Sequence, residues 1–155
     1  MLLRRFYEKK LAQASYMIGC QATGVALVVD PHRDSEVYLR AAAEEGLTIT
    51  HVSETHIHAD YLSGARQLAR RSDATLLLSG EGGIDWQYAF VGEEHTQAVH
   101  NGDEIEVGNV VIEILPYPGS HPRTHLFHDY GPSCFTRAAG RADRRFYLCR
   151  RCWPA

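Results

Sequence analysis

Thr55-His56-Ile57-His58-Ala59-Asp60-Tyr61 places three potential metal ligands within five residues. The stretch follows an apolar, β-branched run at 47–52 and precedes a helix-like run at 62–71. His-x-His-x-Asp at a strand-to-helix junction predicts two imidazoles and a carboxylate gathered around one point. Imidazole suits zinc and iron, and a mixed histidine and carboxylate set with open positions suits a catalytic site better than a closed structural one. A polar loop whose histidines only form hydrogen bonds is the alternative, and the strand–loop–helix context favours the metal site.

The composition is that of one globular domain. The chain has 155 residues, 45% of them hydrophobic and 23% charged, which is enough to bury one core. It contains no apolar run of the length that spans a membrane, and its first ten residues lack the apolar segment of a secretory signal. Four cysteines without a signal do not argue for disulfides. We therefore expect a cytoplasmic protein.

The charge is distributed unevenly along the chain. Residues 1–115 carry nine Lys or Arg against seventeen Asp or Glu, a balance of −8. Residues 116–155 carry seven Arg against two Asp, a balance of +5, together with three of the four cysteines. The sequence thus predicts a domain at 1–115 and a tail of different character at 116–155.

Hydrophobic patterns predict an α/β sandwich with the metal loop at a sheet edge. Two strands come first, strands and helices then alternate up to residue 79, and a hairpin follows around Gly108-Asn109. Between them, residues 80–100 look loop-rich, with Trp86, Tyr88 and Phe90 covering the core. The predicted strands are 14–20, 24–30, 47–53, 74–79, 104–107 and 110–115, and the predicted helices are 35–45, stopped by Gly46, and 62–71.

The metal loop resembles the motif Thr-His-x-His-x-Asp-His of the metallo-β-lactamase superfamily. More narrowly, residues 2–115 are similar to persulfide (sulfur) dioxygenases, through Phe6-Tyr7, Leu11 to Tyr16, Gly19-Cys20, Asp30-Pro31 and Glu54 to Asp60 with Ser63-Gly64. The resemblance implies an αββα sandwich, of which this chain would hold the N-terminal part. It also implies oxidation of a glutathione-type persulfide to sulfite with O2 and Fe(II). Bacterial members of the group often carry a rhodanese domain after the metal domain, and the full-length form of this protein is compatible with one.

The resemblance also implies roles for the loop residues. His56 is the candidate for direct iron ligation, His58 is a ligand or its outer partner, and Asp60 orients its neighbours as part of the catalytic group. Tyr61 stands where the wider superfamily has a histidine that helps to hold a second metal. This difference favours one iron over the two zinc ions of a glyoxalase II-like thioester hydrolase, and zinc remains the alternative metal.

The tail departs from the pattern that the resemblance predicts. After Leu115 we expect H-T-P-G-H-T-P-E-H-I-S-F, whose second histidine is a metal ligand, but Ser120 stands there and His121 follows one residue late. Further on we expect G-D-F-I-F-V-G-D-V-G-R-P, whose first aspartate completes the site, but Arg145 occupies the position of that aspartate. His121 is therefore only a further candidate ligand.

A shift of the reading frame accounts for both departures. Codons can be chosen for residues 116–127 and 144–155 that yield the two expected blocks when they are read one nucleotide later. We predict that 116–155 is a poorly ordered, out-of-frame tail that follows an insertion near codon 115, and that the chain is impaired as an enzyme.

Other interpretations of the chain are a thioester hydrolase and a non-catalytic fragment. Cys149-x-x-Cys152 has half the spacing of a zinc ribbon, or that of a redox pair, and no second pair accompanies it. The tail arginines come without a nucleic-acid-binding motif. We expect a small thiol or persulfide substrate and neither nucleic acid nor membrane as a partner, and the sequence is compatible with a homo-oligomer.

Overall fold

The computed structural model describes residues 1–81, 87–114 and 145–146. A six-stranded sheet has the order β1-β2-β3-β4-β5-β6, antiparallel from β1 to β3 and parallel from β3 to β6. Its strands are β1 (Leu2–Glu8), β2 (Gln13–Cys20), β3 (Val25–Val29), β4 (Thr48–Ser53), β5 (Thr75–Ser79) and β6 (Thr96–Val99). The helices are α1 (Glu36–Glu44) and α2 (Ala65–Ser72), and a smaller sheet contains β7 (Glu104–Val107), β8 (Val110–Glu113) and β9 (Arg145–Phe146).

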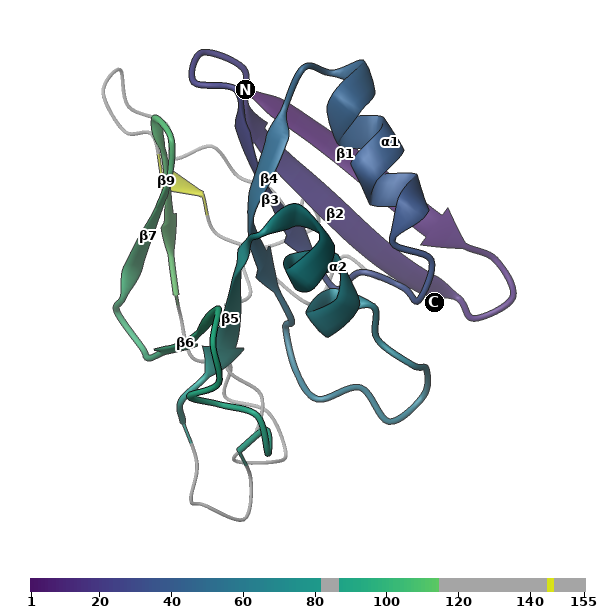
Figure 1. The fold of residues 1–155 in the computed structure, drawn as a ribbon, viewed down its shortest axis with the longest axis vertical. Helices are drawn as coiled ribbons and strands as arrows, with labels where there is room; N and C mark the ends of the chain where they lie inside the picture. The colour runs from purple at the N-terminus through teal and green to yellow at the C-terminus, as the bar shows by residue number, and fades with distance from the viewer. Residues whose placement is uncertain (82–86, 115–144, 147–155) are drawn as a thin grey trace.

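Strand β3 explains the layered arrangement, because both of its faces are buried. Ala26 and Val28 belong to the core beneath α1 and α2, whereas Leu27 and Val29 belong to the core between the two sheets. A strand covered on both sides needs the continuous apolar run seen in this sequence. Figure 1 shows the two helices in front of the large sheet and the smaller sheet to its left. The described residues thus form three successive layers of the expected αββα sandwich: helices, sheet and sheet.

Most predicted elements are confirmed, with three corrections. The helix after the metal loop begins at Ala65 rather than at 62, and Leu62 is 69% exposed. Residues 96–99 form β6 although we placed them in a loop, and β1 at the N-terminus was missed. The hairpin pairs Val107 with Val110 as predicted. In the described parts of the chain, no helix is long and apolar enough to cross a membrane.

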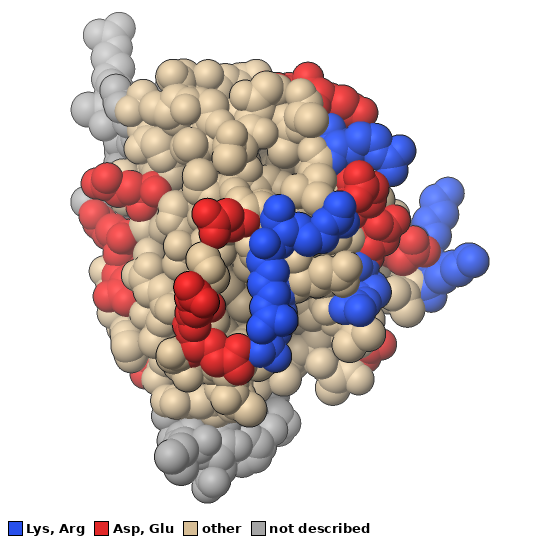
Figure 2. Space-filling view, in the orientation of Figure 1, with Lys and Arg blue, Asp and Glu red and all other residues tan. Residues whose placement is uncertain are grey.

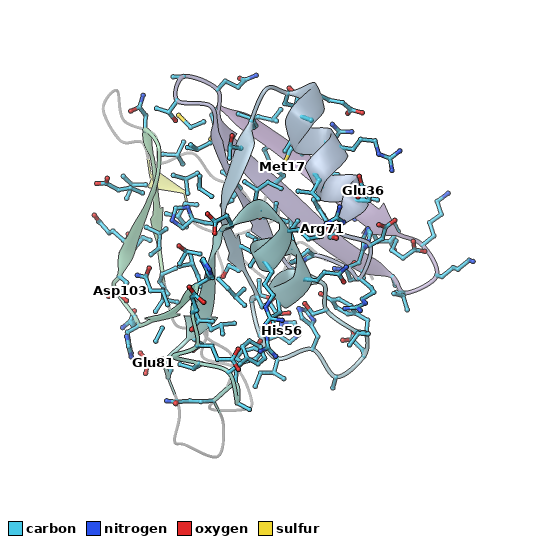
Figure 3. The ribbon with its side chains drawn as sticks, viewed as in Figure 1. Met17, Glu36, His56, Arg71, Glu81 and Asp103 are labelled. Carbon is cyan, nitrogen blue, oxygen red and sulfur yellow. The ribbon has the colours of Figure 1, made fainter. Side chains whose placement is uncertain are left out.

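The two helices are linked on their outer surface by charged side chains. Arg71 of α2 bonds Glu36 of α1 at 2.7 Å and the Ser35 hydroxyl at 2.8 Å. Figure 3 shows Arg71 and Glu36 meeting between the helices, and Figure 2 shows basic and acidic side chains interspersed over this face. Such exposed pairs contribute at most about 1 kcal/mol each, so the buried cores account for most of the stability.

Gly64 allows the metal loop to dock on the segment that follows β3. Its N–H donates to the Pro31 carbonyl at 2.9 Å, and His32 forms a β-bridge with Ser63. A side chain on Gly64 would clash with the His32 carbonyl oxygen. The glycine therefore fixes the end of the loop and the point where α2 begins.

Candidate metal centre

The predicted metal loop connects β4 to α2 at the C-terminal end of the parallel strands. Strands β3 and β4 are parallel neighbours, so residues that follow them in the chain meet at this edge of the sheet. Figure 3 shows His56 at the lower end of the sheet. Asp30, the residue after β3, thereby comes to lie against the loop.

Asp30 is the centre of the hydrogen-bond network beneath the loop. It is 3% exposed and has a φ of 51°, a left-handed conformation that is uncommon for a residue other than glycine. Its carboxylate accepts hydrogen bonds from the Thr55 N–H and the Thr55 hydroxyl, both at 2.7 Å. Its N–H donates to the Ser53 carbonyl at 2.9 Å. These contacts hold the strained backbone in place.

His58 is oriented by Asp30. Its Nε2 lies 3.0 Å from Oδ1 of Asp30, and the two side chains are 3% and 4% exposed. A carboxylate only accepts, so Nε2 carries the proton and Nδ1 is the nitrogen left to coordinate a metal. Burial lowers the pKa of His58, but the hydrogen bond and charge of Asp30, with the charges of Glu54 and Asp60, outweigh this and leave the pKa raised.

His56 is oriented by Thr55 with the opposite ring nitrogen. Its Nδ1 lies 2.8 Å from the Thr55 hydroxyl. That hydroxyl donates its single hydrogen to Asp30, so it accepts from Nδ1–H of His56, and Nε2 is then the nitrogen with a lone pair. The rings of His56 and His58 lie 4.1 Å apart between centroids. One buried carboxylate thus sets the tautomers of both histidines.

Asp60 occupies a more peripheral place than the sequence predicts. Its carboxylate lies 3.8 Å from Nδ1 of His58, beyond hydrogen-bond distance, and its side chain is 73% exposed. Within residues 1–81 and 87–114, no three His, Cys, Asp or Glu side chains are arranged to hold a metal ion. The described residues thus offer two neighbouring imidazoles, and a catalytic zinc or iron site takes at least one further protein ligand.

Tyr61 points into the network. Its hydroxyl lies 3.2 Å from Nε2 of Gln13 and 3.4 Å from the Asp30 carbonyl oxygen, and its ring lies 4.4 Å from that of His58. Burial, with the nearby charges of Asp30 and Glu54, raises the pKa of Tyr61, so the phenol stays protonated at neutral pH. A protonated phenol turned toward the backbone is poorly suited to bind a second metal.

The sequence model of the Metallo-beta-lactamase superfamily matches residues 9–135. The chain belongs to the metallo-β-lactamase superfamily. Among curated proteins, it is 28% identical to a hydroxyacylglutathione hydrolase of Rhodospirillum rubrum over 76% of the chain, and 25% identical to the mitochondrial persulfide dioxygenase ETHE1 of Bos taurus over 92% of it. It spans 43% and 56% of the lengths of these relatives.

Solved structures of this superfamily share the fold. A metallo-β-lactamase from Staphylococcus aureus superposes with a TM-score of 0.76 and 47% identity, over 81% of this chain and 37% of that one. ETHE1 from Myxococcus xanthus superposes with a TM-score of 0.69 and 31% identity, over 81% of this chain and 52% of that one. The prediction of a metallo-β-lactamase fold is confirmed.

A cavity of about 340 Å³ opens beside the metal loop. His58, Tyr61 and Glu54 line it, together with Arg33 and Phe90. Glu54 is 5% exposed, and its Oε1 has no hydrogen-bond partner in the part of the chain that the structure describes. Burial raises the pKa of Glu54, although Ser63 and Tyr88 approach its carboxylate closely enough to oppose this.

The sequence analysis missed Asp30, Gln13 and Glu54 as members of the site. All three carried a signal only through the resemblance, which gave them no role. His121 lies outside the described residues, as do Cys149 and Cys152. The superfamily match continues past the boundary that we predicted after residue 115 and includes His121.

Proposed function

We propose that residues 1–115 carry the N-terminal part of a persulfide dioxygenase domain, which oxidises a glutathione-type persulfide to sulfite with O2 and Fe(II). The observation that carries this proposal is the chain of hydrogen bonds from His58 through Asp30 and Thr55 to His56. It sets the two rings to present Nδ1 and Nε2, which suits joint coordination of one metal. The similarity to persulfide dioxygenases supports the same reaction.

Iron bound to His56 and His58 would supply the open positions at which O2 and the substrate sulfur are activated. The described residues contribute orientation and shielding. Asp30 holds His58 in one tautomer, and the cavity lined by His58, Tyr61 and Phe90 offers the substrate a partly apolar place beside the metal. Substrate held there would have its sulfur next to the His58 ring.

Glu54 and Arg33 would meet the polar groups of such a substrate. Glu54 brings a buried acceptor without a partner in the described residues, and Arg33 brings a cation. A thiol that carries ammonium and carboxylate groups matches both side chains. We further propose that the protein acts in the cytoplasm on such a small molecule.

We also propose that residues 116–155 are translated out of frame and that the 155-residue chain is impaired. The one-nucleotide shift would restore a histidine and an aspartate to complete the pair formed by His56 and His58. The alternative is that His121, which lies in the matched range, acts in the present frame. Resequencing the DNA for residues 112–127 from an independent template decides whether the extra base exists.

A thioester hydrolase is the second candidate, because a hydroxyacylglutathione hydrolase is among the relatives. Tyr61 argues against it, since its hydroxyl faces Gln13 and Asp30 instead of offering a ligand to a second metal. Two bound zinc ions and thioester cleavage without O2 would favour the hydrolase over the dioxygenase.

The deciding experiment compares the 155-residue chain with a chain extended in the shifted frame, both loaded with Fe(II). We expect persulfide-dependent O2 consumption and sulfite from the extended chain, little from the 155-residue chain, and loss of activity in His56→Ala. His100→Ala, at an exposed histidine paired with Asp103, is the matched control. Inactivity of the extended chain would reject the proposed reaction, and full activity of the 155-residue chain would reject its impairment.

A further inference from the structure

Asp30 requires support, because its left-handed backbone must be stable for its carboxylate to reach His58. This conformation is unfavourable for a residue other than glycine, and such strain persists only where the surrounding structure holds it. The N–H of Asp30 and its carboxylate are held by Ser53 and Thr55. Its carbonyl oxygen is the remaining backbone group, and it is held from the other side by Gln13 and Tyr61.

Gln13 and Tyr61 converge on this one oxygen. Nε2 of Gln13 donates to the Asp30 carbonyl at 2.5 Å, and the Tyr61 hydroxyl lies 3.4 Å from the same oxygen. The two side chains also contact each other at 3.2 Å, which closes a triangle of polar atoms. The reverse orientation of the Gln13 amide would place two acceptors against each other, so the amide nitrogen faces Asp30.

Gln13 is buried, so its amide does not serve the solubility of the protein surface. The residue is 2% exposed on β2, and its Oε1 has no hydrogen-bond partner in the described part of the chain. An amide left half-satisfied in this way costs free energy, which a leucine or methionine of the same size would avoid. The donor that Gln13 directs at Asp30 is the feature that an apolar side chain could not supply.

We propose that Gln13 and Tyr61 are positioning residues, which clamp the Asp30 carbonyl and so keep its carboxylate aimed at Nε2 of His58. Tyr61 stands where the wider superfamily has a histidine that helps to hold a second metal, and here its hydroxyl would hold the Asp30 carbonyl instead. The inference rests on the proposed function only in that it concerns His58. The hydrogen bonds orient the His58 ring whether or not iron is bound.

The test is the tautomer of His58 in the metal-free 155-residue chain, read from long-range ¹H–¹⁵N imidazole spectra at a pH where the ring is neutral. We expect a single Nε2–H tautomer in the wild type, with the signal assigned through His58→Gln. Tyr61→Phe keeps the ring against His58 but removes the hydroxyl, and we expect a mixture of tautomers. Tyr7→Phe, at a tyrosine that is 46% exposed on β1, is the matched control and should leave the wild-type signal.

Gln13→Met and the double variant test whether the two residues act together. Because both hold one oxygen, the double variant should change the tautomer ratio less than the sum of the single changes. Gln13 is buried and its variant can unfold, so Tyr61→Phe decides. An unchanged single tautomer in a folded Tyr61→Phe chain, or the same mixture in Tyr7→Phe, would overturn the proposal. Neither result depends on iron or O2, so failure of the proposed reaction is a separate outcome.

Discussion

Oδ1 of Asp30 lies 3.0 Å from Nε2 of His58, although 28 residues separate the two in the sequence. The contact exists because β3 and β4 run parallel and end at the same edge of the sheet. The contact joins Asp30, a strained residue directly after β3, to His58, a candidate metal ligand in the loop after β4. A substitution at either residue should therefore change the orientation of the other side chain.

Asp30→Asn should weaken metal binding in the chain that is extended in the shifted reading frame. Asparagine tolerates the left-handed conformation, so the backbone should survive, but the amide cannot accept from Thr55 and His58 as a carboxylate does. Loss of such an outer partner costs about 10–100-fold in metal affinity. Titration with Co(II), followed by its absorption spectrum, measures the change, and Asp103→Asn, in the turn before β7, is the control. Equal affinity in wild type and Asp30→Asn would show that Asp30 does not orient the ligands.

Leu27→Ala should strongly destabilise the chain, because it truncates a side chain in the buried core. Leu27 is 2% exposed and packs between the two sheets, so its truncation should lower the free energy of unfolding by about 2–5 kcal/mol. Leu62→Ala, at a site that is 69% exposed, should change it by less than about 0.5 kcal/mol. Urea denaturation measures both variants. A small effect at Leu27 would mean that the second sheet does not cover this face.

The sequence predicts the layers well because they depend on local patterns. Residues 25–29 are apolar throughout, and β3 is buried on both faces as that pattern requires. Strand β1 is harder to predict, since this edge strand alternates half-buried and exposed positions and carries two arginines. The start of α2 depends on Gly64 docking against Pro31, a contact between distant segments that no local pattern reveals.

The candidate site follows the same division between local and distant contacts. His56 and His58 are two residues apart and could be predicted as a pair. Their orientation could not, because Asp30 reaches them only through the parallel pairing of β3 and β4. The outward position of Asp60 likewise depends on the course of the folded loop, which spacing alone does not specify.

Gly64→Ala should loosen the metal loop. The new methyl group would meet the His32 carbonyl oxygen, a backbone atom that cannot move aside as a flexible side chain would. Overpacking of this kind typically costs about 1–3 kcal/mol. Thermal unfolding should show the loss of stability, and amide hydrogen exchange across residues 54–64 should become faster. Wild-type protection in the loop would show that the close approach to His32 is dispensable.

Glu54→Gln should make the chain less sensitive to rising pH. Burial raises the pKa of Glu54 above its ordinary value of 4.5, so the folded state holds this proton more tightly than the unfolded state does. Stability that depends on the protonated carboxyl is present below the unfolded pKa and is lost as pH rises through the folded pKa. Wild type should therefore lose stability relative to Glu54→Gln between pH 4.5 and neutrality. Parallel urea titrations across this range measure the difference, and Glu106→Gln, at an exposed glutamate on β7, is the control. A difference that is constant with pH would show that the Glu54 carboxyl titrates alike in the folded and unfolded states.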